Sequence, residues 1–245
     1  RLTHLDNIDP VFMDPPDDPG RQYSVPYLWG TTGIGYRRSA VDGTPDSWAA
    51  LYTDPANAGR IALLNSEDTL YSALKYLGFS LNTTSQAEID AAVELVVAAK
   101  PRIRTFAPDT GQDLLLSQEV DLALEYSGDL QQVMAEDDDL GYIVPNEGAL
   151  IWEDSMCLVK DAPNPEEAHA FVDFVLDAEN AARIAEWVLY ATPNKAAKAL
   201  LPKEILDDPA IYPSDETLAK CEFAKYKGED VQRMYDDALT RILAA

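Results

Sequence analysis

Trp152 and Asp154 place an aromatic ring and a carboxylate two positions apart, within the stretch 151–155. This stretch is predicted to be a buried strand, in which residues i and i+2 point to the same side. We therefore expect Trp152 and Asp154 to face one way and Glu153 the other. The face of an aromatic ring attracts an organic ammonium, and a carboxylate accepts its N–H bonds. The pair predicts a receptor for such a cation, and the alternative is a core tryptophan beside a loop aspartate.

The composition is strongly acidic. The 245 residues include 43 acidic and 19 basic side chains, for a formal net charge of -24 at pH 7. This balance argues against nucleic acid as a partner, because phosphates require basic patches, and against anionic membrane surfaces. It favours cationic ligands, which a negative field concentrates. Solubility and a salty habitat are alternative reasons for the same charge.

The cysteines and histidines do not predict a metal site or a cofactor. Cys157 and Cys221 lack the spacing of a metal or redox motif, and so do His4 and His169. Cys157 lies in an apolar stretch and is expected to be a small core residue; a disulfide to Cys221 stays open. No apolar stretch reaches the roughly 18 residues that span a bilayer, so we expect no membrane insertion.

Short strands that alternate with helices predict an α/β fold, followed by a helical tail after Asn164. The strands are expected at 23–29, 61–64, 103–106, 120–126, 140–144 and 150–159. The main helices before the tail are expected at 66–77, 85–100, 111–117 and 129–135. The glycine-rich stretch 30–35 lacks the GK[ST] ending of a phosphate loop, so its glycines are expected to let two segments approach closely.

Several segments, taken in order over essentially the whole chain, resemble the polyamine-binding proteins of bacterial ABC transporters, the spermidine/putrescine family. They are YSVPYLWGTTGIG at 23–35, DSWAAL at 46–51, PNEG at 145–148, WEDS at 152–155, YATPNKAA at 190–197 and IYP at 211–213. Any one of these segments is weak, and the ordered set is specific.

The resemblance implies the two-lobed α/β fold of type II periplasmic binding proteins, with a ligand cleft between the lobes. The first lobe would hold residues 1–30 and 151–195, and the second 31–150 and 196–245. Family members carry an opening βαβα stretch before the point where this chain starts, so the first lobe is expected to be incomplete. A fragment, a cleaved chain or a second chain that completes the lobe would each explain this. We expect the isolated chain to associate or aggregate through uncovered apolar surface.

The resemblance also assigns ligand contacts. Trp152 and Asp154 match the family motif that stacks on the ligand and grips an amine. Asp68 falls where the family places an acid near the start of a helix, and Glu67 is the alternative because the local alignment is uncertain. The alternative to a ligand contact, for either acid, is a favourable interaction with the helix dipole.

Two tyrosines complete the expected site. Tyr126 matches a position where the family often has tryptophan, and a tyrosine ring keeps cation–π contact. Tyr190 matches another aromatic of the family, whereas Glu125 is expected to be solvated on the opposite face. The spermidine-type proteins carry a glutamine in the segment that corresponds to 222–226, and none stands there. The length of the ligand therefore stays open.

The implied function is capture of putrescine or spermidine and its delivery to an ABC permease, by a periplasmic or membrane-tethered protein. A binding protein for another small cation, a metal ion or an organic anion is an alternative. An enzyme that uses Asp68 and Asp154 as an acid/base pair, as in glycoside hydrolysis, is a further one. An adaptor role is the last alternative.

Overall fold

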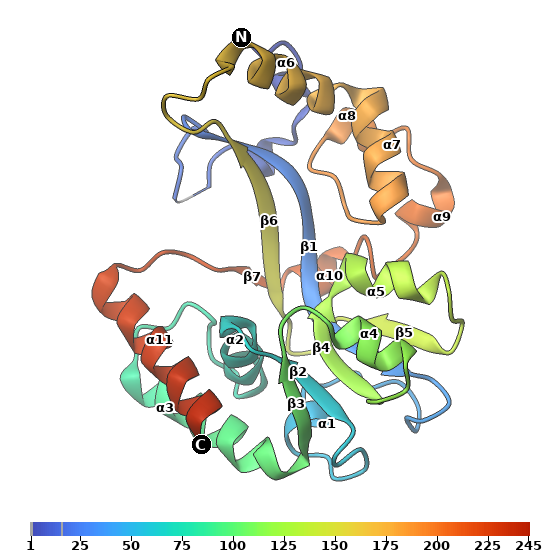
Figure 1. Cartoon of the computed structure of the whole chain (residues 1–245), viewed down its shortest axis with the longest axis vertical. Coiled ribbons are helices and arrows are strands. Elements are labelled where there is room, and N and C mark those ends of the chain that lie inside the picture. The colour runs from blue at the N-terminus through green and yellow to red at the C-terminus, as the bar shows by residue number, and fades with distance from the viewer. Residues whose placement is uncertain (1, 16) are drawn as a thin grey trace. The chain divides into compact units, whose positions relative to one another are not determined.

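The computed structural model describes residues 2–15 and 17–245, and these residues fall into two compact units. Unit 1 consists of residues 1–30 and 152–212, and unit 2 of residues 31–151 and 213–245. Strands β1 (Ser24–Arg37) and β6 (Leu150–Cys157) each run from one unit into the other (Figure 1). Compared with the expected lobes, residues 196–212 lie in unit 1, because Ala197 and Leu201 pack with the small buried residues of helix α7 (Ala178–Val188).

Unit 2 is built on a mixed sheet whose strands follow the order β3-β2-β4-β1-β6-β7, with β5 also paired to β1. The strands not yet defined are β2 (Ile61–Leu64), β3 (Ile103–Ala107), β4 (Leu122–Tyr126), β5 (Leu140–Ile143) and β7 (Glu222–Phe223). Strand β2 pairs in parallel with β3 and β4, whereas β1 runs antiparallel to β4 and β5. A Cβ on Gly33 would lie 2.5 Å from the Ile143 carbonyl oxygen, which confirms that glycine permits a close approach of strands here.

The helices of unit 2 cover this sheet in two groups (Figure 1). In one group α2 (Glu67–Tyr76), α3 (Gln86–Ala99) and α11 (Glu229–Ala244) pack on one another. In the other, α4 (Gly111–Leu116) and α5 (Ser127–Met134) pack on β4 and β5. The short helices α1 (Ala49–Tyr52) and α10 (Asp215–Leu218) complete the unit, with the 3-10 turn η3 (Lys100–Arg102). Because helices cover both faces, β2 and most of β4 are buried on both sides.

Unit 1 consists of the first part of β1, most of β6, and helices. The helices are α6 (Pro165–Leu176), α7 (Ala178–Val188), α8 (Lys195–Lys198) and α9 (Lys203–Leu206), preceded by the 3-10 turns η1 (Leu5–Asn7) and η2 (Pro10–Phe12). Asp177 caps α7 by accepting from the backbone N–H groups of Glu179 and Asn180. The helix ends at Leu189, whose left-handed φ of 58° turns the chain toward Tyr190.

The strand prediction for 150–159 was right in type, but its expected burial was wrong for the second half. Leu150 and Ile151 are buried, whereas Asp154, Ser155 and Cys157 are exposed. Cys157 is therefore not a core residue, and both cysteines are free thiols. The apolar pattern alone did not distinguish a strand that is buried along its whole length from one whose second half is exposed.

Candidate functional site

The candidate residues form two groups, one within each unit. In unit 1, the half-buried ring of Trp152 on β6 meets the ring of Tyr190 edge-on. The ring centroids lie 5.1 Å apart and the planes cross at 76°. The left-handed turn at Leu189 places Tyr190 beside a residue that lies 38 positions earlier in the chain. Two aromatic rings from different elements thus form one surface, of the kind that packs against an alkyl ammonium.

Asp154 is the carboxylate of this group. Partial burial raises the pKa of Asp154. Burial also raises the pKa of Tyr27 on β1, and the negative charge of Asp154 raises it further, so the phenol and the carboxylate lie close together. Sequence reasoning missed Tyr27. The signal that could have found it is its place in the PYLWG motif of a strand that neighbours β6.

Glu153, which lies between Trp152 and Asp154 in the sequence, is bound to Arg21 and Ser155. Its Oε2 accepts from Nη2 of Arg21 at 2.5 Å, and its Oε1 accepts from the Ser155 hydroxyl at 2.7 Å. The Arg21 side chain is only 3% exposed and also donates through Nε to the Phe12 carbonyl oxygen. Arg21 therefore neutralises Glu153, and Asp154 is left as the carboxylate beside Tyr27.

In unit 2, Asp68 lies in the first turn of α2 and is 8% exposed. Its Oδ2 accepts from the hydroxyls of Ser66 at 2.5 Å and of Tyr126 at 3.3 Å. Its Oδ1 is buried and has no hydrogen-bond partner among the described residues. Burial raises the pKa of Asp68, and the two hydroxyl bonds oppose that rise. A buried carboxylate with one unmatched oxygen is poised for a donor, because burying an unpaired charge is costly.

Tyr126 provides the ring beside this carboxylate. It is the last residue of β4 and is half-buried, and its hydroxyl points to Asp68. Burial raises the pKa of Tyr126, and the charge of Asp68 raises it further. The phenol therefore stays protonated and donates to Asp68, and an aromatic ring beside a carboxylate favours a cation.

Glu67 has both oxygens occupied. Its Oε2 accepts from the Tyr71 hydroxyl, and its Oε1 accepts from Nε2 of Gln232 at 2.6 Å. Gln232 lies on α11, after the segment 222–226 in which the resemblance led us to expect a glutamine. The two adjacent acids thus have different surroundings: Glu67 joins α2 to α11, and Asp68 faces the end of β4.

The expectation that Glu125 is solvated was wrong. Glu125 is fully buried, since β4 is covered on both faces. Its Oε1 accepts from the Gly111 N–H at 2.7 Å, where α4 begins, and its Oε2 accepts from the Tyr126 N–H at 3.1 Å. Burial raises the pKa of Glu125 to about 8.

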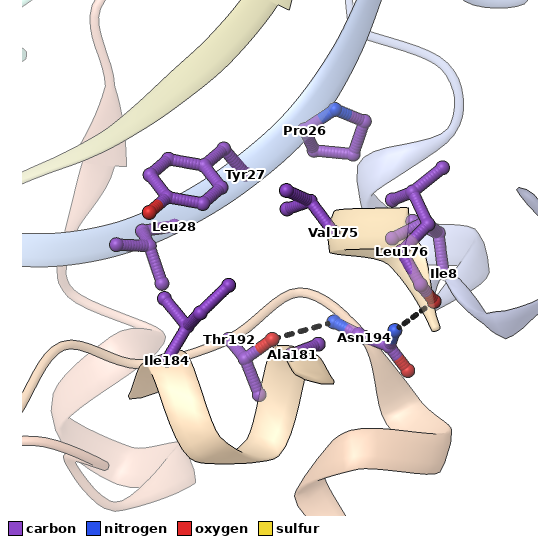
Figure 2. A pocket seen from close by; sticks show the side chains of 10 residues that line it. All are labelled: Ile8, Pro26, Tyr27, Leu28, Val175, Leu176, Ala181, Ile184, Thr192 and Asn194. Carbon is purple, nitrogen blue, oxygen red and sulfur yellow. Dashed lines mark hydrogen bonds between the residues drawn. The ribbon is translucent and has the colours of Figure 1, made fainter. Parts of the chain in front are cut away.

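Figure 2 shows a different kind of hollow, within unit 1. It is lined mainly by apolar side chains, among them Pro26, Leu28, Val175 and Ile184. Its polar side chains are those of Tyr27, Thr192 and Asn194. Asn194 donates to the Leu176 carbonyl oxygen at 2.8 Å and accepts at Oδ1 from the Ala197 N–H. No acid lines it, so this hollow does not suit a cation.

Metal ligation and membrane crossing were two further possibilities for residues 2–15 and 17–245. These residues contain no group of three or more His, Cys, Asp or Glu side chains arranged to hold a metal ion. Within the same residues, no helix combines the length and the apolar character needed to cross a bilayer.

Comparison with known proteins gives consistent matches. The family model described as bacterial extracellular solute-binding protein matches residues 1–213. A spermidine/putrescine-binding periplasmic protein of Salmonella typhimurium is 33% identical over 245 residues, which cover 100% of this chain and 70% of that protein. A putrescine/agmatine-binding protein of Pseudomonas aeruginosa is 34% identical, over 89% of this chain and 65% of that protein.

The solved structure of the spermidine/putrescine ABC transporter substrate-binding protein PotD from Streptococcus pneumoniae is similar in fold. It superimposes with a TM-score of 0.89 at 32% identity, over 99% of this chain and 75% of that chain. All three relatives are named as binding proteins, and the Streptococcus protein is named as that of an ABC transporter.

Proposed function

Because this chain belongs to the family of bacterial extracellular solute-binding proteins, we propose that it binds a polyamine and delivers it to the permease of an ABC transporter. Membership confirms the resemblance inferred from the sequence motifs, and the α/β fold agrees with that of the matched structure. The family also places the protein outside the cytoplasm, in the periplasm or tethered to the membrane.

The observation that carries the proposal is the unmatched Oδ1 of Asp68 beside the ring of Tyr126. An ammonium group supplies what this oxygen lacks, a hydrogen-bond donor with a positive charge. The neighbouring ring favours the same cation through its π-face. An organic anion would find no donor at this oxygen and would meet a carboxylate instead.

The group in unit 1 supports the same class of ligand. Trp152 and Tyr190 form an aromatic surface that suits methylene groups, and Asp154 supplies a second carboxylate. Each group of residues, taken by itself, suits an ammonium joined to methylenes, because the charge can meet an acid. The formal net charge of -24 would speed the capture of such a ligand.

Binding without chemical conversion is the role we propose. The two acids of the alternative acid/base pair have neighbours of another kind. Asp68 accepts from Ser66 and Tyr126, and the charge of Asp154 acts on Tyr27. A polyamine also offers no bond that an acid pair of the glycosidase type would cleave.

Isothermal titration with putrescine and spermidine at moderate salt tests the proposal. We expect saturable binding by the parent chain and a loss of about 100-fold in affinity for Asp68→Asn and Asp154→Asn, since each leaves a ligand charge unpaired. The matched control is Asp215→Asn, which removes an exposed acid from the first turn of α10 and should bind like the parent. Silence of the parent with both ligands would reject polyamine binding. Parental affinity in both site variants would reject the assigned site.

The relatives' additional length suggests a partner for the apolar hollow of unit 1. The chain spans 70% of the Salmonella protein, so part of that fold has no counterpart in the residues compared. We propose that a further segment, on a longer chain or on a second one, packs on the hollow lined by Pro26, Leu28, Val175 and Ile184. Association of the present chain in light scattering is expected, and a monodisperse monomer would count against it.

A further inference from the structure

The side chain of Arg21 joins three segments of unit 1 and is only 3% exposed. Its Nε donates to the Phe12 carbonyl oxygen in η2 at 2.7 Å, and its Nη1 donates to the Ser24 hydroxyl at the start of β1 at 3.0 Å. On β6, Nη1 also donates to the Ser155 hydroxyl at 3.1 Å, and Nη2 donates to Oε2 of Glu153 at 2.5 Å. The planar guanidinium therefore ties η2, β1 and β6 together through donors that point in fixed directions.

The backbone at Arg21 adopts a conformation that favours glycine. Its φ is 51°, directly after Gly20 at φ 73°. A residue with a side chain persists in this left-handed region where the surrounding contacts hold it. Here the Asp18 carbonyl oxygen accepts from the Arg21 N–H at 2.9 Å, and the Asp18 carboxylate accepts from the Ser24 N–H at 2.9 Å and the Ser24 hydroxyl at 2.7 Å. These bonds fix the turn from which the Arg21 side chain reaches β6.

The two side chains that this guanidinium binds on β6 lie on the face opposite to the candidate ligand residues. Glu153 and Ser155 are two positions apart and bind the same group, so they share one face of the strand. Trp152 and Asp154 alternate with them and lie on the other face. On that face the Trp152 ring meets the Tyr190 ring at a centroid distance of 5.1 Å.

We propose that Arg21 is a positioning residue for the unit 1 part of the polyamine site. It fixes one face of β6 against β1 and η2, and thereby holds the Trp152 ring and the Asp154 carboxylate on the other face in the geometry that binds the ligand. Contacting side chains keep such a geometry when the hydrogen bonds of the residues that support them fix it. This role rests on the proposed function, since it concerns how the same site is held.

The test compares the parent chain with Arg21→Lys, which keeps a positive charge for Glu153 but cannot reproduce the forked set of hydrogen bonds. The matched control is Arg183→Lys, the same change at an exposed arginine of α7. Far-ultraviolet circular dichroism verifies that each variant is folded. If Arg21→Lys does not fold, the double variant Arg21→Gln with Glu153→Gln replaces it, because this removes both charges of the buried pair together.

The first measurement is the affinity for putrescine by titration calorimetry. We expect Arg21→Lys to lower the affinity about tenfold at an unchanged stoichiometry, and Arg183→Lys to change it by less than about twofold.

The second measurement is the near-ultraviolet circular dichroism of Trp152 without ligand, taken as the difference between each protein and the same protein with Trp152→Phe. Because this signal requires fixed packing of the ring, we expect Arg21→Lys to lower it by about half and Arg183→Lys to leave it unchanged. A residue that only stabilises the fold would lower the melting temperature and leave both measurements on the folded protein unchanged.

The outcomes separate the role of Arg21 from the proposed function. A parental affinity or a parental Trp152 signal in the folded variant would overturn the positioning role, and putrescine binding by the parent would leave polyamine binding intact. Silence of the parent with putrescine and spermidine would reject the proposed function, and the Trp152 signal would then still decide whether Arg21 holds the ring.

Discussion

The Tyr126 hydroxyl donates to Oδ2 of Asp68 at 3.3 Å and joins the end of β4 to the first turn of α2. The two residues are 58 positions apart in the sequence. The bond gives Oδ2 a hydrogen-bond donor, whereas Oδ1 has no hydrogen-bond partner among the described residues. Tyr126 therefore orients Asp68 while its ring stays beside the same charge.

Removal of this hydroxyl should weaken ligand binding without abolishing it. In Tyr126→Phe the ring is kept and the hydrogen bond to a charged acceptor is lost, so we expect the polyamine affinity to fall about tenfold. Because that hydroxyl bond lowers the pKa of Asp68, its loss should also shift the loss of binding in acid to a higher pH. Titration calorimetry from pH 5 to 8 measures both effects. Tyr226→Phe, at a 67% exposed tyrosine, is the control and should change neither.

Asp68 and Glu67 should respond differently to removal of charge. We expect Asp68→Asn to lower affinity about 100-fold, because its carboxylate is assigned to the ligand. Glu67→Gln should lower putrescine affinity by less than about fivefold, since both Glu67 oxygens are bound within the protein. Calorimetric titration of both variants with putrescine decides which of the two acids contacts the ligand. The reverse order of effects would move the ligand contact to Glu67.

Glu125 should make folding stability depend on pH. Its pKa is raised from 4.5 to about 8, so the folded state holds a proton that the unfolded state releases. The stabilisation is complete below pH 4.5 and declines as the pH rises toward about 8. We therefore expect a lower melting temperature at pH 8.5 than at pH 6.

The control for that experiment is Glu125→Gln, which cannot titrate. Thermal unfolding followed by circular dichroism should show a smaller difference between the two pH values in this variant than in the parent. An equal difference in both proteins would assign the pH dependence to other groups.

Gly148 should not tolerate a side chain. Its φ is 84°, and a Cβ would lie 2.1 Å from the Lys220 carbonyl oxygen. Its own carbonyl oxygen accepts from the Trp48 indole at 2.9 Å, so the backbone cannot move away freely. We expect Gly148→Ala to destabilise the protein by about 3 kcal/mol.

Gly43→Ala is the matched control, because Gly43 has a similar φ of 78° and nothing within 4 Å of the added Cβ. Its cost should be only that of the backbone conformation, about 1 kcal/mol. Urea denaturation of both variants measures the difference. Equal costs would show that the contact with Lys220 relaxes.

Much of the architecture could be read from the sequence, since alternating apolar stretches and helix signals have local causes. The motifs at 23–35 and 152–155 indicated the family, and their order along the chain made the indication specific. The spacing of two between Trp152 and Asp154 likewise predicted a ring and a carboxylate on one side of a strand.

Other features depended on packing between distant segments. Sequence alone left Asp68 and Glu67 as alternatives, because the local alignment was uncertain. Their surroundings differ because they come from two distant elements, the end of β4 for Asp68 and α11 for Glu67. Glu125 was misplaced because helices cover both faces of β4, which no pattern within that strand reveals. Tyr27 and Gln232 acquired their partners only when segments far apart in the chain came together. The sequence thus determined which elements form, and tertiary packing decided which of their charges are left unpaired, since pairing depends on neighbours that local sequence does not specify.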